Sequence, residues 1–151
     1  MTGLNVLELI AAILLVNAVI WIPVVRWMTR KGQILRDGMV EECRRSGERM
    51  VIGPQSCLYR GADSVYGNIK GNGVVCLTDK RVVFEKLTGQ RIAINRTDIA
   101  GVSEERWFRG KTAFGTGASG HLVFHTADGN RVGFLIKDTK RWVRELQIHD
   151  E

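Results

Sequence analysis

Residues 71–86 read GNGVVCLTDKRVVFEK and contain two short runs of β-branched and aromatic residues separated by a polar pair. The first run is GVVCLT (73–78) and the second is RVVFEK (81–86), with Asp79 and Lys80 between them. Valine and phenylalanine favour strands, and a short polar connection between two such runs is typical of a β-hairpin. The stretch therefore predicts two antiparallel strands joined by a tight turn.

Similar runs lie on both sides of this hairpin. They are SCLYRG (56–61), VYGNIK (65–70), QRIAIN (90–95), GVSEERWF (101–108), HLVFHT (121–126) and RVGFLI (131–136). The last two flank Asp128-Gly129, the strongest hairpin signal in the chain, because glycine accepts the positive φ that such turns require. We therefore expect six to eight short antiparallel strands.

The chain ends differently, with TKRWVRELQI (139–148) after a possible N-cap at Asp138. In a helix, apolar Trp142, Val143 and Leu146 would share one face, and basic side chains would occupy the opposite face. Strands followed by a single helix predict a mainly β (α+β) domain whose helix closes one opening of a curled sheet.

The segment Gly71 to Lys86 is similar to the strand-turn-strand of GRAM and bacterial PH-like domains. In these domains a glycine precedes a strand ending Leu-Thr-Asp-Lys/Arg-Arg, and the next strand reads apolar-apolar-Phe. RIAINRTDIAGVSEE (91–105), HLVFHTADGNRVGFLI (121–136) and the helix around Trp142 follow in the family's order. The resemblance covers about residues 50–147, and its motifs are short.

This resemblance implies a PH-like split β-barrel of about seven antiparallel strands capped by a C-terminal helix, over residues 51–148. Known members of the family bind lipids or proteins and do not catalyse reactions. An apolar N-terminal segment and a glycine-rich stretch at 109–120 depart from the family pattern.

The apolar segment is LNVLELIAAILLVNAVIWIPVV, residues 4–25, with Glu8 as its single ionisable side chain. As a helix it would reach about 33 Å, enough for a hydrocarbon core of ~30 Å. It lacks the preceding positive charge and the small-residue cleavage site of a signal peptide, and a core helix is rarely apolar on every face. We therefore predict a transmembrane helix.

Basic and aromatic residues mark the far end of this helix. The predicted membrane-interface residues are Trp21, Arg26, Trp27, Arg30 and Lys31, and no Lys or Arg precedes the apolar run. The positive-inside rule then places the N-terminus outside and the C-terminal domain in the cytoplasm, as a single-pass protein.

Residues 26–50 are dense in charge and broken by Gly32, Gly38 and Gly47. Because glycine disfavours helix interiors, this composition predicts an interrupted, partly helical juxtamembrane spacer between membrane and domain.

The glycine-rich stretch RGKTAFGTGASG (109–120) invites comparison with a phosphate-binding loop. That motif needs a glycine five positions before Gly110, where this chain has Glu105, and a helix after Thr112, which AFGTGASG disfavours. Two readings stay open: a flexible connection, or a membrane contact in which basic residues alternate with aromatic rings. Trp107 or Phe108 should face the core, which leaves Phe114 as the candidate exposed ring.

A second basic candidate is the turn between the first two strands. Lys80 and Arg81 lie there, although a polar turn also needs such residues merely to stay solvated. Arg60 and Lys70 could join them if their strands neighbour that turn. The full set of lipid- or partner-binding candidates is Lys80, Arg81, Arg106, Arg109, Lys111 and Phe114.

No pattern in the chain predicts catalysis, a metal site or a cofactor. Cys43, Cys57 and Cys76 have no CxxC spacing and suit reduced cytosolic thiols. His121 and His125 would stand about 13 Å apart along a strand, too far to share a metal. An RNP-like aromatic pair is absent, which disfavours nucleic acid. A small-molecule substrate is likewise not expected.

The net charge of +6 suits a domain held beside anionic lipid. We therefore expect a non-catalytic, membrane-anchored PH-like module that binds anionic lipid headgroups, a membrane-associated protein, or both. The alternative is a scaffold or assembly subunit of a membrane complex without lipid specificity, which presents a sheet edge or the 109–120 loop. The sequence gives no oligomeric state.

Overall fold

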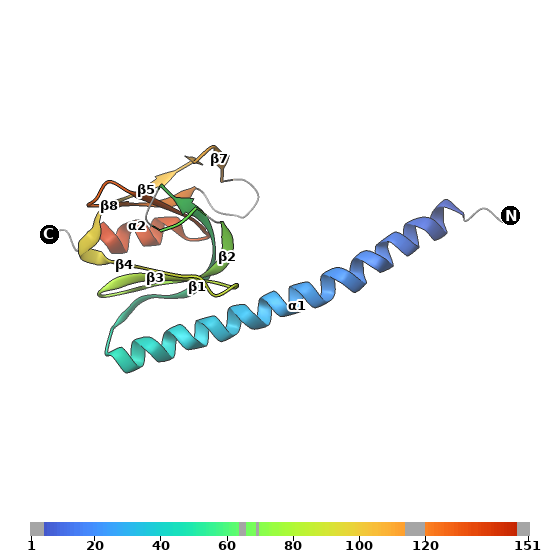
Figure 1. Ribbon diagram of the computed structural model, residues 1–151, viewed down its shortest axis with the longest axis horizontal. Helices are drawn as coiled ribbons and strands as arrows, with labels where there is room; N and C mark the ends of the chain where they lie inside the picture. Colours follow the sequence, from blue (N-terminus) through green and yellow to red (C-terminus); the bar gives the residue numbers. More distant parts are fainter. Residues whose placement is uncertain (1–4, 64–65, 69, 114–119, 148–151) are drawn as a thin grey trace.

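The computed structural model describes residues 5–63, 66–68, 70–113 and 120–147. A long helix, α1 (Val6–Ser46), leads into a curled antiparallel sheet, which a short helix, α2 (Thr139–Gln147), closes (Figure 1). The main strands are β1 (Met50–Ala62), β2 (Gly71–Thr78), β3 (Arg81–Lys86), β4 (Arg91–Asn95), β5 (Ile99–Glu105), β8 (His121–Thr126) and β9 (Arg131–Ile136). The described residues form one seven-stranded sheet in the order β4-β3-β2-β1-β9-β8-β5. This architecture is consistent with a PH-like half-barrel.

Aromatic side chains fill the inside of the curl. The ring of Tyr59 on β1 lies 5.3 Å from Phe84 on β3 and 5.4 Å from Phe134 on β9, between ring centroids. Trp142 of α2 is fully buried and lies edge-on to Phe124 at 6.3 Å. The predicted C-terminal helix is therefore confirmed, and Trp142 and Leu146 are the buried residues by which it closes the barrel.

The two hairpins with the strongest signals are confirmed, at residues 71–86 and 121–136. In the second, Gly129 has the positive φ, 83°, that the turn requires. The SCLYRG run is the later part of the longer strand β1.

Two strand predictions are wrong. The described residues of VYGNIK form no strand, because Gly67 has φ 82° and the Tyr59 hydroxyl lies within hydrogen-bond distance of the carbonyls of Tyr66 (3.1 Å) and Gly67 (2.7 Å). The GVSEERWF run is broken at Arg106, after which Trp107–Phe108 forms β6 and pairs with β7 (Lys111–Thr112).

The first half of α1 is apolar and unpacked. Residues 5–27 are all exposed, and the helix is long and apolar enough to cross a membrane. A helix that exposes apolar side chains on every face is stable where lipid surrounds it.

The second half of α1 packs on the outer face of the sheet. The predicted interruption in residues 26–50 is wrong, because α1 continues through Gly32 and Gly38 and ends only at Gly47, whose φ is 67°. Each interior glycine costs ~1 kcal/mol relative to alanine. Burial of Met39 on α1 against Val74 and Val83 of the sheet offsets this cost.

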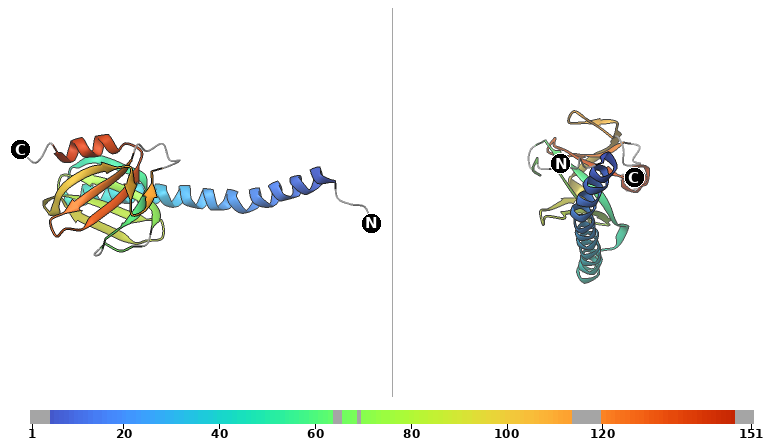
Figure 2. Two further views of the ribbon diagram at one scale, coloured as in Figure 1. Left: turned by 90° about the horizontal axis from the view of Figure 1, so that it is seen from above. Right: turned by 90° about the vertical axis from the view of Figure 1, so that its right-hand side faces the viewer.

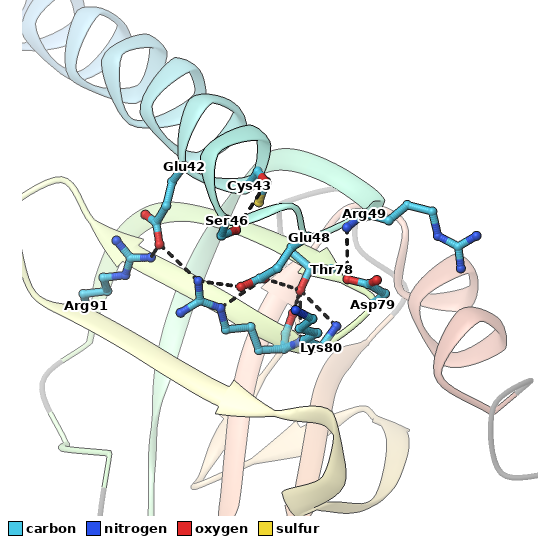
Figure 3. A network of polar contacts seen from close by, with 10 residues as sticks. Glu42, Cys43, Ser46, Glu48, Arg49, Thr78, Asp79, Lys80 and Arg91 are labelled. Atoms are coloured by element: carbon cyan, nitrogen blue, oxygen red, sulfur yellow. Dashed lines mark hydrogen bonds and ion pairs between the residues drawn. The ribbon is translucent and has the colours of Figure 1, made fainter.

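A polar network fastens the end of α1 to the β2–β3 turn (Figure 3). The Arg81 guanidinium lies 2.9 Å from Glu48 and 3.2 Å from Glu42, and Glu42 also pairs with Arg91 at 2.6 Å. The Thr78 hydroxyl donates to Glu48 at 2.9 Å. Arg81 is thus the hub that joins the helix to the barrel.

Substitution of Arg81 tests this junction. Arg81→Met would leave the Glu48 carboxylate, whose side chain is only 8% exposed, without its cation. We expect the free energy of unfolding to fall by about 1–3 kcal/mol. Denaturant titration of the detergent-solubilised protein measures it, and peptide-resolved alkylation of the buried Cys43 reports separation of α1. Lys80→Met, at an exposed neighbour, is the matched control, and equal stability of the two variants would contradict the role of Arg81.

The same junction depends on pH. Burial alone would raise the pKa of Glu48, but hydrogen bonds from Arg81 and Thr78 and the charge of Arg81 hold this pKa below its ordinary value of 4.5. A lowered folded-state pKa gives a stabilisation that is complete above the unfolded pKa and is lost as pH falls through the folded pKa. The stability difference between wild type and Arg81→Met should therefore shrink below about pH 4.5. A difference that stays constant into that range would contradict this linkage.

Candidate functional site

The barrel has two ends at different distances from the apolar half of α1. After α1 ends, β1 turns back and runs along the helix toward its apolar half (Figure 1). That half projects beyond the barrel (Figure 2). We call the end where β1 finishes and β2 begins the proximal end, and the end with the β2–β3 turn the distal end. The eight residues of β2 separate the two ends by about 26 Å.

Four cations gather at the proximal end and form what we call the proximal basic cluster: Arg60, Lys70, Arg109 and Lys111. Arg60 Nη2 donates to the Thr112 carbonyl at 3.4 Å, and Arg109 Nη1 donates to the Ala62 carbonyl. Partial desolvation and the positive charges of Lys111, Arg60 and Arg109 lower the pKa of Lys70. Lys70 therefore lies close enough to the other three cations to be affected by their charge.

Among the described residues, none of the four cations of this cluster forms an ion pair with a carboxylate. The Arg60 Nε is buried and has no hydrogen-bond partner there. Concentrated positive charge without internal compensation attracts anions, and a buried guanidinium donor gains most from an anionic acceptor.

The β6–β7 hairpin carries half of the cluster. Its turn residues Arg109 and Gly110 have φ 51° and 70°, the left-handed pair that a two-residue hairpin turn uses. Lys111 and Thr112 then form β7. The Gly-Lys-Thr tripeptide is therefore a hairpin turn and strand, and it does not open a helix onto a phosphate.

Phe108 anchors this hairpin, and Trp107 faces outward. Phe108 is 2% exposed and packs on the outer face of the sheet over Gly133, with the Arg131 guanidinium 5.8 Å from its ring. Trp107 is 64% exposed. The hairpin that carries Arg109 and Lys111 thus also exposes an indole ring. An amphipathic ring and cations on one hairpin are suited to a lipid interface, because the ring lodges at the interface and the cations attract anionic headgroups.

The predicted basic candidates divide between the two ends. Lys80 is exposed and Arg81 is held by Glu42 and Glu48, both at the distal end. Arg60 and Lys70, which could have joined the turn that contains Lys80, lie instead at the proximal end with Arg109 and Lys111. Arg106 is exposed between β5 and β6.

Two other predictions concern rings. Phe114, the predicted exposed ring, lies outside the described residues. Sequence reasoning missed Trp107, since it left open which of Trp107 and Phe108 faces the core. The adjacent aromatic pair was the available signal, because neighbours on a strand point to opposite faces.

The predicted interface residues follow one another along α1. Trp21, Arg26, Trp27, Arg30 and Lys31 are all exposed. Met28 and Thr29 line a crevice of ≈ 480 Å³ together with Leu58 of β1 and Asn72 of β2. Measured along the axis of α1, the start of its basic half therefore lies level with the proximal end of the barrel.

One further polar group lies on the outer face of β5 and β8. The Ser103 Oγ is 2.8 Å from Nε2 of His125 and donates to Glu105 at 3.0 Å. Ser103, His125 and Glu105 thus form one small polar group on this face of the sheet. Across the described residues, no three His, Cys, Asp or Glu side chains are placed to hold a metal ion.

Comparison with known protein families finds no family model that matches this chain, and comparison with curated proteins finds no match.

Gly133 tests how the hairpin is held. A methyl group at Gly133 would overlap the Phe108 ring, whereas one at Gly101, on the same outer face, would meet open space. Gly133→Ala should expose Phe108 and lower the free energy of unfolding by about 2 kcal/mol. Gly101→Ala should change it by less than about 0.5 kcal/mol. Chemical denaturation of both variants measures this, and similar effects would show that Phe108 does not anchor the hairpin.

Proposed function

We propose that this protein is a non-catalytic, membrane-anchored PH-like (GRAM-type) module whose proximal basic cluster and Trp107 contact anionic lipid headgroups. The observation that carries the proposal is the uncompensated cluster of Arg60, Lys70, Arg109 and Lys111 at the barrel end nearer the apolar helix. The curled seven-stranded sheet with its closing helix supports the PH-like assignment. The cations that follow the apolar helix support a cytoplasmic barrel with the N-terminus outside.

The height of the cluster supports a membrane contact. Leu58 and Asn72 share a crevice with Met28 and Thr29. Arg60 and Lys70 each lie two residues further toward the proximal end, about 7 Å along their strands. Along a helix, 7 Å corresponds to about four or five residues. Counted back from Met28 and Thr29, this distance brings the cluster level with the last apolar residues of α1.

The anchor changes what lipid binding would achieve. A juxtamembrane cation contributes ~1 kcal/mol near an anionic surface. The tethered barrel is already at high effective concentration, so such weak contacts are sufficient. The helix would therefore hold the protein at the membrane, and lipid binding would set the orientation of the barrel on the membrane surface.

Lipid quenching of Trp107 tests this proposal. The full chain is placed in phosphatidylcholine nanodiscs with or without phosphatidylglycerol, using lipids with brominated acyl chains. The fluorescence difference between wild type and Trp107→Phe isolates Trp107. We expect its quenching in anionic discs only, and we expect added salt to reduce it because salt screens exposed charges.

Two variants distinguish the ends of the barrel. Arg109→Gln/Lys111→Gln removes two proximal charges, which should weaken docking about 30-fold, from about 2 kcal/mol. Lys80→Gln removes a distal charge and should leave quenching unchanged. Quenching that is equal in neutral and anionic discs, or that responds to Lys80 as strongly as to Arg109 and Lys111, would exclude the proximal cluster as the lipid contact.

A further inference from the structure

A groove follows the free edge of the sheet at β5. Among the described strands, β5 is terminal in the sheet order and pairs only with β8. Val102, Ser103 and Glu104, three consecutive residues of β5, all line one cavity of ≈ 650 Å³. Because side chains alternate between the faces of a sheet, three consecutive residues share a cavity only where it runs along the strand edge. The backbone groups on this side of β5 therefore face the groove.

Helix α2 forms the opposite wall. Lys140, Val143, Arg144 and Gln147 line the same cavity, and their spacing places them on one stripe of the helix. A second cavity of ≈ 530 Å³ shares Val102 and Gln147 and adds Ile99 and Gly101 of β5. The groove thus extends from Ile99 to Glu104, about 20 Å, the length of six extended residues.

The groove has an apolar floor and a basic rim. Val102 and Val143 are partly buried against the core. The groove is lined by four basic residues and two acidic ones. The basic residues are Arg49, Arg96, Lys140 and Arg144, and the acidic residues are Asp79 and Glu104. In the described part of the chain, Lys140 and Arg144 form no ion pair. Positive charge therefore predominates around an apolar strip.

We propose that this groove binds an extended acidic peptide segment of a partner protein, which adds to the sheet as a further strand beside β5. An unpaired strand edge supplies backbone donors and acceptors in register with an extended chain. Alternate side chains of the peptide would cover Val102 and Val143, and its acidic side chains would meet Lys140 and Arg144. The site does not use the proximal basic cluster, so it stands independently of lipid binding.

The groove is tested with peptide probes and the full chain in detergent micelles. The probe is a fluorescein-labelled, end-capped peptide of alternating Glu and Val, and fluorescence anisotropy measures its dissociation constant. A Lys-Val peptide of the same length tests charge. A Glu-Val peptide N-methylated at alternate amides tests backbone pairing, because methylation removes the donors that a strand needs. We expect saturable binding of the first peptide only.

Charge reversal on α2 locates the binding site. Lys140→Glu/Arg144→Glu should weaken Glu-Val binding at least about tenfold, since each exposed ion pair contributes up to ~1 kcal/mol and reversal adds repulsion. Arg141→Glu places the same charge on the same helix outside the groove and should leave affinity unchanged.

Several outcomes overturn the proposal. They are absence of saturable binding, equal binding of the Lys-Val or N-methylated peptide, and equal effects of the Arg141 and Lys140/Arg144 variants. Sedimentation velocity tests for one further outcome that would overturn it. A dimer that the Lys140/Arg144 variant dissociates would show that the groove takes a second copy of this chain.

Discussion

The packing of the second half of α1 on the outer face of the sheet is the constraint on which the rest of the structure depends. Met39 and Cys43 are buried there, and Arg81 joins Glu42 of the helix and Glu48, just after it, to the β2–β3 turn. Because the chain reverses at Gly47, β1 must run back along the helix toward its apolar half. This reversal determines which end of the barrel lies near the apolar helix and which end lies about 26 Å further away.

The proximal end owes its chemistry to a second packing contact. Phe108 occupies the space above Gly133, and this contact holds a hairpin that the main sheet does not include. Arg109 and Lys111 thereby reach Arg60, near the end of β1, and Lys70, just before β2, which lie about 40 to 50 residues earlier in the chain. Trp107 faces outward because its neighbour faces inward.

The two surfaces proposed for ligands differ in physical character. The proximal basic cluster is a charged tip with one exposed indole, suited to a planar anionic surface. The β5 groove is a linear, partly apolar channel with unpaired backbone along one wall, suited to an extended chain. They occupy different parts of the barrel, so an anchored barrel oriented by lipid would leave the groove open to a partner.

The sequence alone determined the elements whose signals are local. The apolar run after residue 5 predicted a helix long enough to cross a membrane, and the described residues form one. The hairpins at 71–86 and 121–136 and the helix around Trp142 were also predicted correctly, because each signal depends on spacing within a few residues. Arg109 and Lys111 were also recognised as candidates from local charge. Tertiary structure decided the remainder. It kept α1 helical through Gly32 and Gly38 by packing the helix on the sheet. It also drew the carbonyls of Tyr66 and Gly67, in a segment predicted to be a strand, to the Tyr59 hydroxyl. It also placed Arg81 in an ion-pair network and Arg60 and Lys70 in the proximal basic cluster. These outcomes depend on contacts between residues far apart in the chain, and local sequence patterns carry no information about which distant partner a side chain will meet.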